Sequence, residues 1–311
     1  MNRLRKNLES YLTVRRALGY KLRRYEITLG KFVSFLEKKR ARYITSKLAL
    51  EWARQPSSAR PNSWAGRLGI VRGFAKHMSA VDPRTEVPPR GLLPHQSGRT
   101  RRPYIYTDEE VRRLLAAARK LRPTDGLIPW TYSTVLGLLW VTGMRVSEAL
   151  NLDRSDVDVS AGILTVRDTK FGKSRFVPVH KTTQTSLEAY ARRRDQIFPT
   201  AKSPAFFLTS IGTRPTREVV NMTFIQLSRE TGLRSETALS GPRVHDMRHS
   251  FTVRSLVNFY KAGITDLDRH VYTLSVYLGH VDPSTTYWYM TAVPELLSLA
   301  HRRLEKTLGG I

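Results

Sequence analysis

One apolar stretch, WTYSTVLGLLWVTG at residues 130–143, sets the strongest limit on the fold of this 311-residue chain. A helix with no polar face has to be buried on all sides, so other helices must surround it. The stretch ends in a glycine, and the segment MRVSEALNL follows at once. Its second residue, Arg145, lies at the junction between two predicted helices. A buried cation needs a partner or a ligand, and Glu148 lies three residues on, on the same helical face. The sequence therefore predicts a helical domain that holds an arginine beside its core.

Most of the remaining chain also has helical periodicity. A capping box from Thr107 to Glu110 precedes the helical segment VRRLLAAARKL. The period changes to two between residues 162 and 179, where GILTVRD and SRFVPV are predicted to form two short strands around the basic turn TKFGK. Lysines at such a hairpin tip either enter a DNA groove or protect an edge strand. The chain is therefore predicted to be mainly α-helical with a small antiparallel β-sheet, an α+β fold.

Residues 82–103, DPRTEVPPRGLLPHQSGRTRRP, are rich in proline and glycine and lack an apolar period. Such a composition is typical of a linker or a surface loop. It divides the chain into a helical N-terminal domain over residues 1–82, a basic interdomain linker over 83–103 and a second domain over 104–311. We expect four helices in the first domain, with cationic faces that bind DNA phosphates. The last helix of the chain either completes the core of the second domain or packs on a neighbouring protomer.

The charge balance indicates a polyanionic partner. Lys and Arg number 52 against 26 Asp and Glu, which gives a formal net charge of +26. The basic residues are spread over the whole length, so a broad surface that binds nucleic acid fits better than a basic tail. The chain has no cysteine, which excludes disulfides and thiolate metal sites. No run approaches the roughly 18 apolar residues of a membrane span, and we expect a cytoplasmic protein that acts on DNA and not on membranes.

The segment over residues 242–290 gathers side chains that act on phosphates. It contains PRVHDMRHSF and then YLGHVDPSTTYWYM, which supply His245, Arg248, His280 and Tyr289. Two imidazoles, a guanidinium and a phenol provide cationic or hydrogen-bonding donors and a nucleophile. No carboxylate cluster and no His/Cys spacing in the sequence suits a metal, so we expect neither a metal nor another cofactor.

Four motifs follow one another in an order that resembles the tyrosine recombinase (phage integrase) family. The helical N-terminal domain is similar to the core-binding domain of that family, a SAM-like fold, and the second domain to its catalytic domain. The resemblance thus spans almost the whole chain, and the ordered set is far more specific than any single motif. The motifs are TGMRVSEAL at 142–150, the hairpin DTKFGKSRFVPV, HDMRHSF at 245–251 and LGHVDPSTTYWYM at 278–290.

The resemblance implies a role for each matching residue. Arg145 and Arg248 would hold the non-bridging oxygens of the scissile phosphate, and Tyr289 would be the nucleophile. Lys170 in the hairpin would protonate the leaving 5′-oxygen, with Lys173 as the competing candidate. The implied catalytic residues are Arg145, Lys170, His245, Arg248, His280 and Tyr289, with Glu148 supporting the first arginine.

The nucleophile is assigned from its spacing. Tyr289 lies nine residues after His280, which is the spacing found in the family. Tyr287 is the alternative, but two residues earlier on a helix it would point elsewhere. A phenol is protonated at neutral pH, and His245 is the natural group to take its proton. His249 is expected only to pack against the site or to support it.

The resemblance implies a site-specific DNA recombinase of the integrase or transposase type. The 3′-phosphotyrosyl bond that it forms would store the energy of the broken linkage, so rejoining would need no ATP. The two arginines would supply the positive charge that stabilises the transition state, so no metal would be needed. We expect a homo-tetramer on two paired DNA sites, alone or with sister recombinases. The long interval between Arg248 and His280 resembles recombinases carried by transposable elements.

Two other functions are compatible with the sequence. One is a DNA-binding accessory protein without activity, and the other is a type IB topoisomerase-like enzyme that relaxes DNA as a monomer. The complete set of implied catalytic residues argues against the first. The N-terminal helical domain and the amphipathic C-terminal helix favour an assembling recombinase over the second.

Overall fold

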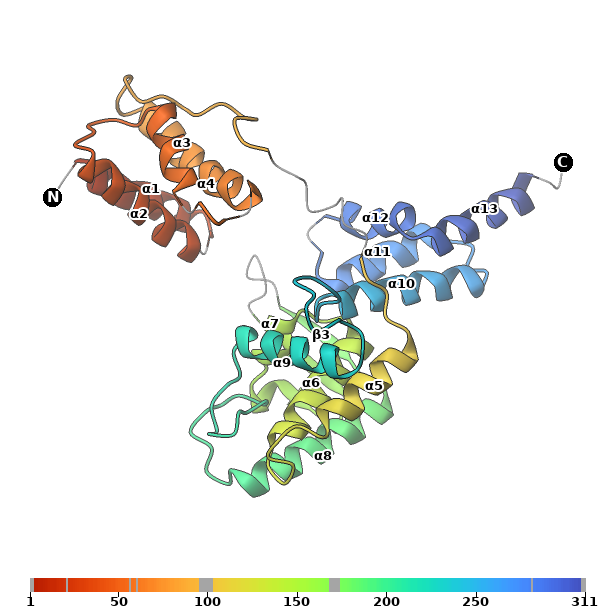
Figure 1. Cartoon of the computed structure of the whole chain (residues 1–311). Helices are drawn as coiled ribbons and strands as arrows, with labels where there is room; N and C mark the ends of the chain where they lie inside the picture. The colour runs from red at the N-terminus through yellow and green to blue at the C-terminus, as the bar shows by residue number, and fades with distance from the viewer. Residues whose placement is uncertain are drawn as a thin grey trace. The chain divides into compact units, whose positions relative to one another are not determined.

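The computed structural model describes residues 3–20, 22–55, 57–59, 61–94, 103–167, 174–280 and 282–308 (Figure 1). They belong to two compact units, residues 1–101 and 102–311, and each unit has a hydrophobic core of its own. No helix within these ranges is both long and apolar enough to cross a membrane.

Four helices that each bury one apolar face form the first unit, as the sequence predicts. Their inward side chains include Phe32, Trp52 and Phe74, which are at most 2% exposed. Thr45 caps the third helix, because its side chain accepts a hydrogen bond of 3.2 Å from the backbone N–H of Leu48. The helices are α1 (Arg3–Ala17), α2 (Arg23–Lys38), α3 (Ser46–Arg54) and α4 (Pro61–Ser79).

The chain that follows α4 packs on this unit, although a linker is predicted from residue 83. Arg72 donates hydrogen bonds of 2.7 Å to the carbonyls of Pro88 and Pro89. Leu93 is 5% exposed and belongs to the core of the four helices. The proline-rich segment therefore begins as part of the helical unit. Residues 95–102 lie outside the described residues, and the role of the segment as an interdomain linker stays a prediction.

The second unit is mostly helical with one small sheet, and this confirms the predicted fold class. Strands β1 (Val157–Asp158), β2 (Ile163–Val166) and β3 (Arg175–Pro178) pair antiparallel in that order. The sequence predicts the hairpin of β2 and β3, whereas β1 is too short to show a period. The helices are α5 (Asp108–Ala118), α6 (Ile128–Thr142), α7 (Val146–Leu150), the 3₁₀ turn η2 (Arg154–Asp156), α8 (Lys181–Ile197), α9 (Arg217–Glu230), α10 (Asp246–Lys261), α11 (Leu267–Leu278), α12 (Ser284–Ala292) and α13 (Pro294–Leu308).

Helix α6 lies in the core of this unit, as its apolar sequence requires. Its side chains are buried on nearly all sides, and Val135 and Leu139 are each 1% exposed. The helix ends at Gly143, whose φ of +63° is left-handed. A Cβ atom on Gly143 would lie 2.8 Å from Cγ of Phe251 and 3.2 Å from Cδ2 of Leu278. The glycine therefore allows α10 and α11 to approach the end of α6.

Helices α10 to α13 enclose a further core, drawn in blue in Figure 1. Leu256, Leu278 and Leu296 are fully buried in it, and Tyr289 of α12 lies among them with 2% exposure. Because α10 contacts both α6 and this group of helices, the two cores of the unit are joined. The junction is where the predicted site residues gather.

We expect alanine at position 143 to destabilise the second unit. Left-handed strain and the clash with Phe251 together cost about 2–5 kcal/mol of unfolding free energy. Gly137→Ala is a matched control on the same helix, since its Cβ would meet only Leu115 Cδ2, at 3.9 Å, and a helical alanine stabilises by roughly 0.5–1 kcal/mol. Calorimetry of the full chain should therefore show a lower unfolding temperature of the second unit for alanine at position 143 and a higher one for Gly137→Ala. Equal shifts for the two variants would contradict the role given to Gly143.

Candidate active site

Arg145 lies between α6 and α7, as the sequence predicts, and it forms the predicted pair with Glu148. Its backbone N–H donates to Oε2 of Glu148 at 3.0 Å, and its Nη1 donates to Oε1 at 2.6 Å. The other end of the guanidinium, Nη2, donates to the carbonyl of Gly279 at 3.0 Å. The arginine is therefore fixed at both ends, with 27% of its side chain exposed.

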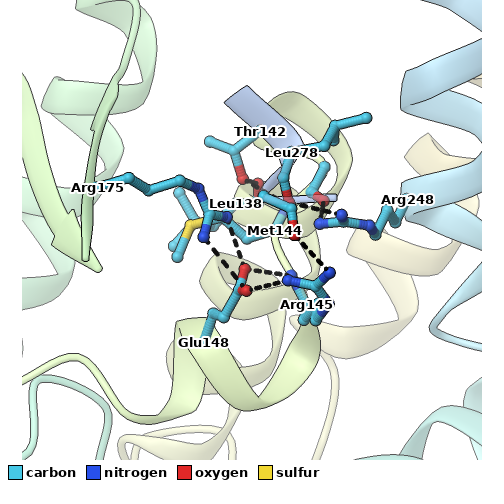
Figure 2. A network of polar contacts seen from close by, with 10 residues as sticks. Leu138, Thr142, Met144, Arg145, Glu148, Arg175, Arg248 and Leu278 are labelled. Atoms are coloured by element: carbon cyan, nitrogen blue, oxygen red, sulfur yellow. Dashed lines mark hydrogen bonds and ion pairs between the residues drawn. The ribbon is translucent and has the colours of Figure 1, made fainter. Parts of the chain in front are cut away.

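A second arginine, Arg175 of β3, shares the same carboxylate (Figure 2). Its Nη2 and Nη1 lie 2.7 and 3.3 Å from the two oxygens of Glu148. Burial alone would raise the pKa of Glu148, but the hydrogen bonds and charges of Arg175 and Arg145 outweigh it and lower that pKa to about 2. Arg175 is absent from the predicted residues. A signal for it exists, because two-residue alternation places it on the same face of β3 as Val177, which is fully buried.

Arg248 ties the ends of α6 and α11 together. Its Nη1 donates to the carbonyl of Gly143 at 2.8 Å and its Nη2 to that of Leu278 at 2.6 Å. It is 3% exposed, and burial followed by the charge of Arg145 lowers its pKa to about 9. Leu278 and Gly279 are adjacent, so the same helix end anchors Arg248 and Arg145. Figure 2 shows the two guanidiniums on this shared support.

The two predicted histidines lie beside these arginines, His280 half-buried and His245 exposed. Nδ1 of His280 lies 2.8 Å from Oγ1 of Thr286, and desolvation together with the charges of Arg248 and Arg145 lowers its pKa to about 3. His245 precedes the first turn of α10, and desolvation by the surrounding protein, followed by the charges of His249 and Arg248, lowers its pKa to about 4. Both imidazoles are therefore neutral at pH 7 and available for hydrogen bonds.

Tyr289 and Tyr287 have the different orientations that the sequence predicts. Burial raises the pKa of Tyr289 to about 12, although the charge of Arg248 acts in the opposite direction. Tyr287 is 40% exposed, and its hydroxyl donates to Oδ1 of Asp268 at 3.0 Å. The tyrosine at position 289 is therefore the one that lies inside the site.

His249 is in direct contact with Tyr289, whereas the sequence predicts only that it packs against the site or supports it. Its Nδ1 is hydrogen-bonded to the phenolic oxygen. Its ring also meets the ring of His245 edge to face, with centroids 4.9 Å apart. The spacing in HDMRHSF contains the signal, since His245 and His249 are four residues apart and neighbours along a helix.

A cavity of about 390 Å³ opens beside Arg145 and His245. Residues that can bind an anion line it, including Arg217 and Asn221 of α9 and Arg243 next to α10. The positive charge of its lining, which includes Arg145, makes it a place where a phosphate would be favoured.

The hairpin turn that carries Lys170 and Lys173 lies outside the described residues. Its described ends, Val166 and Arg175, pair with each other, and Arg175 is part of the site. Within the described ranges no group of three His, Cys, Asp or Glu residues is placed to hold a metal ion. The roles of the lysines and the metal-free chemistry stay predictions.

Glu148→Gln is expected to destabilise the second unit in a pH-dependent way. The folded pKa of about 2 lies below the ordinary value of 4.5, so the ionised carboxylate contributes about 3 kcal/mol. The contribution is present in full above about pH 4.5 and is lost as the pH falls towards 2. Denaturant titrations should therefore show a loss of up to about 3 kcal/mol at pH 7 and of about half that at pH 3.

Glu109→Gln serves as the matched control for this measurement. Glu109 is 65% exposed and pairs with Arg112, which is also exposed, so its loss should change stability by less than about 0.5 kcal/mol. If Glu148→Gln lost the same stability at pH 3 as at pH 7, the carboxylate would act through packing and not through its charge.

Known proteins resemble this chain over most of its length. Residues 105–295 match the model of the phage integrase family. The integrase/recombinase y4rB of Sinorhizobium fredii is 47% identical over 310 residues, which cover 98% of each chain. The tyrosine recombinase XerD of Mycobacterium tuberculosis is 31% identical over 247 residues, which cover 78% of this chain and 74% of XerD.

A solved structure shares the fold. The Tn1549 transposon integrase, in complex with transposon right end DNA, superimposes with a TM-score of 0.65 at 16% identity, over 96% of this chain and 98% of that one. Together with the family match and the identity to XerD, this leads to one conclusion. The chain belongs to the phage integrase family and is a tyrosine site-specific recombinase.

Proposed function

We propose that this recombinase cuts and rejoins double-stranded DNA through a 3′-phosphotyrosyl intermediate on Tyr289. The observation that carries the proposal is the pair Arg145 and Arg248, anchored on adjacent carbonyls of one helix end. Two guanidiniums in one place repel each other, and the charge of Arg145 contributes to the lowered pKa of Arg248. An anion between them would remove this repulsion and accept charge-assisted hydrogen bonds from both. A DNA phosphodiester is the anion that the net charge of +26 favours.

In the proposed reaction, the phenolic oxygen of Tyr289 attacks phosphorus, and the bond between phosphorus and the 5′-oxygen breaks. The phenol gives its proton to a neutral imidazole, and the leaving 5′-oxygen takes a proton from Lys170, with Lys173 as the alternative. The arginines stabilise the additional negative charge of the pentavalent transition state. The 3′ end stays on the tyrosine, and reversal of the steps joins it to another 5′-hydroxyl. The phosphotyrosyl bond keeps the energy of the broken linkage, so rejoining needs no ATP, and the arginines supply the positive charge that a metal would otherwise supply.

His245 and His280 complete the proposed site as hydrogen-bonding partners of the phosphate. Both are neutral at pH 7 because desolvation and the neighbouring positive charges lower each pKa, so they bind oxygens without adding to the repulsion between the arginines. His245 lines the same cavity as Arg145. The full proposed set is Arg145, Lys170, His245, Arg248, His280 and Tyr289.

The remainder of the chain would bring DNA to this site. We assign residues 1–82 to a DNA-binding domain, residues 83–103 to a basic linker and residues 104–311 to the catalytic domain. Recombination between two sites breaks four strands, and each protomer contributes one Tyr289, so four protomers are required. The identity to y4rB and the fold shared with a transposon integrase support a role in integration or transposition of a mobile element. We expect the protein to act on DNA in the cytoplasm.

A covalent-adduct assay tests the nucleophile. Wild-type protein is mixed, in EDTA, with nicked duplexes that carry a site selected by the protein from random-sequence DNA. We expect a protein–DNA adduct on a denaturing gel, abolished in Tyr289→Phe, because without the phenolic oxygen no phosphotyrosyl bond forms. Tyr287→Phe is the matched control and should retain the adduct, since Tyr287 hydrogen-bonds Asp268 instead.

The same assay separates the proposal from a different nucleophile and from a non-catalytic protein, and relaxation of a supercoiled plasmid separates it from a topoisomerase. Loss of the adduct in Tyr287→Phe alone would keep the reaction and move the nucleophile. Tight DNA binding by the wild type without any adduct would indicate a non-catalytic DNA-binding protein. Relaxation of supercoiled DNA by monomers, without strand exchange, would indicate topoisomerase activity.

Substrates with sulfur in place of the scissile 5′-oxygen test the general acid. A thiolate leaves without receiving a proton, so a variant that lacks the acid should cleave the sulfur substrate at nearly the wild-type rate. We expect Lys170→Ala to slow cleavage of ordinary DNA about 10²–10⁴-fold and to recover on the sulfur substrate. Lys173→Ala is the control, and recovery in that variant alone would transfer the role to Lys173.

A further inference from the structure

We propose that His249, and not His245, accepts the phenolic proton of Tyr289 during attack on phosphorus, and that the Asp246 carboxylate stabilises the imidazolium that results. The inference rests on the proposed function, because it assigns one proton of that reaction. Balance is kept: the phenolic O–H bond breaks, the oxygen bonds to phosphorus, and the proton moves to Nδ1 of His249.

The contact between the two side chains defines the direction of transfer. Nδ1 of His249 is hydrogen-bonded to the phenolic oxygen, and the ring centroids are 5.5 Å apart. Both groups are shielded, since Tyr289 is 2% exposed and the His249 side chain 17%. For Nδ1 to accept the phenolic proton, the neutral imidazole must carry its hydrogen on Nε2. The nucleophile and its proton acceptor are thus already in contact.

Asp246 lies behind the imidazole, one helical turn earlier on α10. Its Oδ1 is 3.9 Å from Nε2 of His249, beyond hydrogen-bonding distance but close enough to attract a positive charge in a buried place. Arg243 fixes this carboxylate through its backbone N–H and its Nη2, both at 2.8 Å. Asp246 is 2% exposed, so its charge is poorly screened. Phenol, imidazole and carboxylate therefore form a series: the imidazole takes the proton of the phenol, and the carboxylate stabilises the positive charge that the imidazole gains.

His245 occupies a different place. It lines the cavity beside Arg145, and its ring meets the ring of His249 edge to face. The two imidazoles therefore divide the work: His245 faces the cavity where a phosphate would lie, and His249 faces the phenol. This division gives each of the three histidines a role: His245 and His280 bind the phosphate, and His249 accepts the proton.

The charged groups around His249 are arranged for a neutral base. Burial lowers its pKa to about 4; the charge of Asp246 acts against this, and those of Arg243 and Arg248 add to it. His245 and Tyr289 contact the imidazole, and His280 lies close enough for its pKa to respond to His249. All three are neutral at pH 7. Because the pKa of Tyr289 is raised to about 12, transfer ahead of attack is strongly unfavourable. The proton therefore moves as the phosphorus–oxygen bond forms, when the phenolic oxygen loses its affinity for it.

The test measures single-turnover cleavage of the nicked duplex by His249→Gln and His245→Gln. We expect His249→Gln to be about 10²–10⁴-fold slower, with no recovery on the sulfur substrate, since the missing group is a base and not the acid. Replacing Tyr289 with 3,5-difluorotyrosine, a more acidic phenol, should restore much of the rate in His249→Gln. It should not restore His245→Gln, whose defect lies in binding the phosphate.

A second variant guards against misfolding. His249→Gly should regain cleavage on addition of imidazole, an effect that a purely structural role would not produce. Cleavage by His249→Gln at the wild-type or a higher rate would overturn the inference, the higher rate showing that the contact restrains the nucleophile. If 3,5-difluorotyrosine restored the cleavage rate in His245→Gln and not in His249→Gln, His245 would be the group that accepts the phenolic proton. Failure of Tyr289→Phe to abolish the adduct would instead refute the proposed function, so the two failures are distinguishable.

Discussion

Repulsion between the guanidiniums of Arg248, which is buried, and Arg145, which is partly exposed, is the constraint on which this site depends. Arg248 is 3% exposed and has Arg145 close enough to lower its pKa. The negative ends of two helix dipoles offset this cost. The carbonyls of Gly143, Leu278 and Gly279 lie at the C-terminal ends of α6 and α11 and accept hydrogen bonds from the two arginines. Both helices end in a left-handed glycine, which lets their last carbonyls turn towards the arginines. The ends of two helices are thus part of the electrostatics as well as of the packing.

A continuous set of contacts connects the sheet to α12, the helix that carries Tyr289. Arg175 on β3 binds Glu148, Glu148 binds Arg145, and Arg145 binds the carbonyl that closes α11. The next residue, His280, reaches α12 through Thr286. Because each link is a hydrogen bond in a poorly exposed place, displacement of one member changes the electrostatics of the next. The orientation of α12 is therefore coupled to the register of a strand that is distant in sequence.

Local features of the site could be predicted from the sequence, whereas contacts between distant segments could not. The end of α6 and the pair of Arg145 with Glu148 follow from glycine chemistry and a spacing of three residues, as the structure confirms. The contact of Tyr289 with His249 joins residues forty apart, and it depends on how α12 packs on α10. The attachment of Leu93 to the first core likewise depends on tertiary packing that proline-rich composition does not reveal.

The pairing of Val166 with Arg175 at the base of the hairpin has an evolutionary consequence. A one-residue slip in register turns every side chain of a strand to the other face. Phe176, which is 72% exposed, would then take the place of the guanidinium, and Glu148 would lose half of its cationic neighbours. Insertions that keep this pair intact leave the contacts of Arg175 with Glu148 unchanged. Natural variation between the strands should therefore be tolerated where it keeps the lysine proposed as the general acid, and any indel that is absorbed within the strands should not be tolerated.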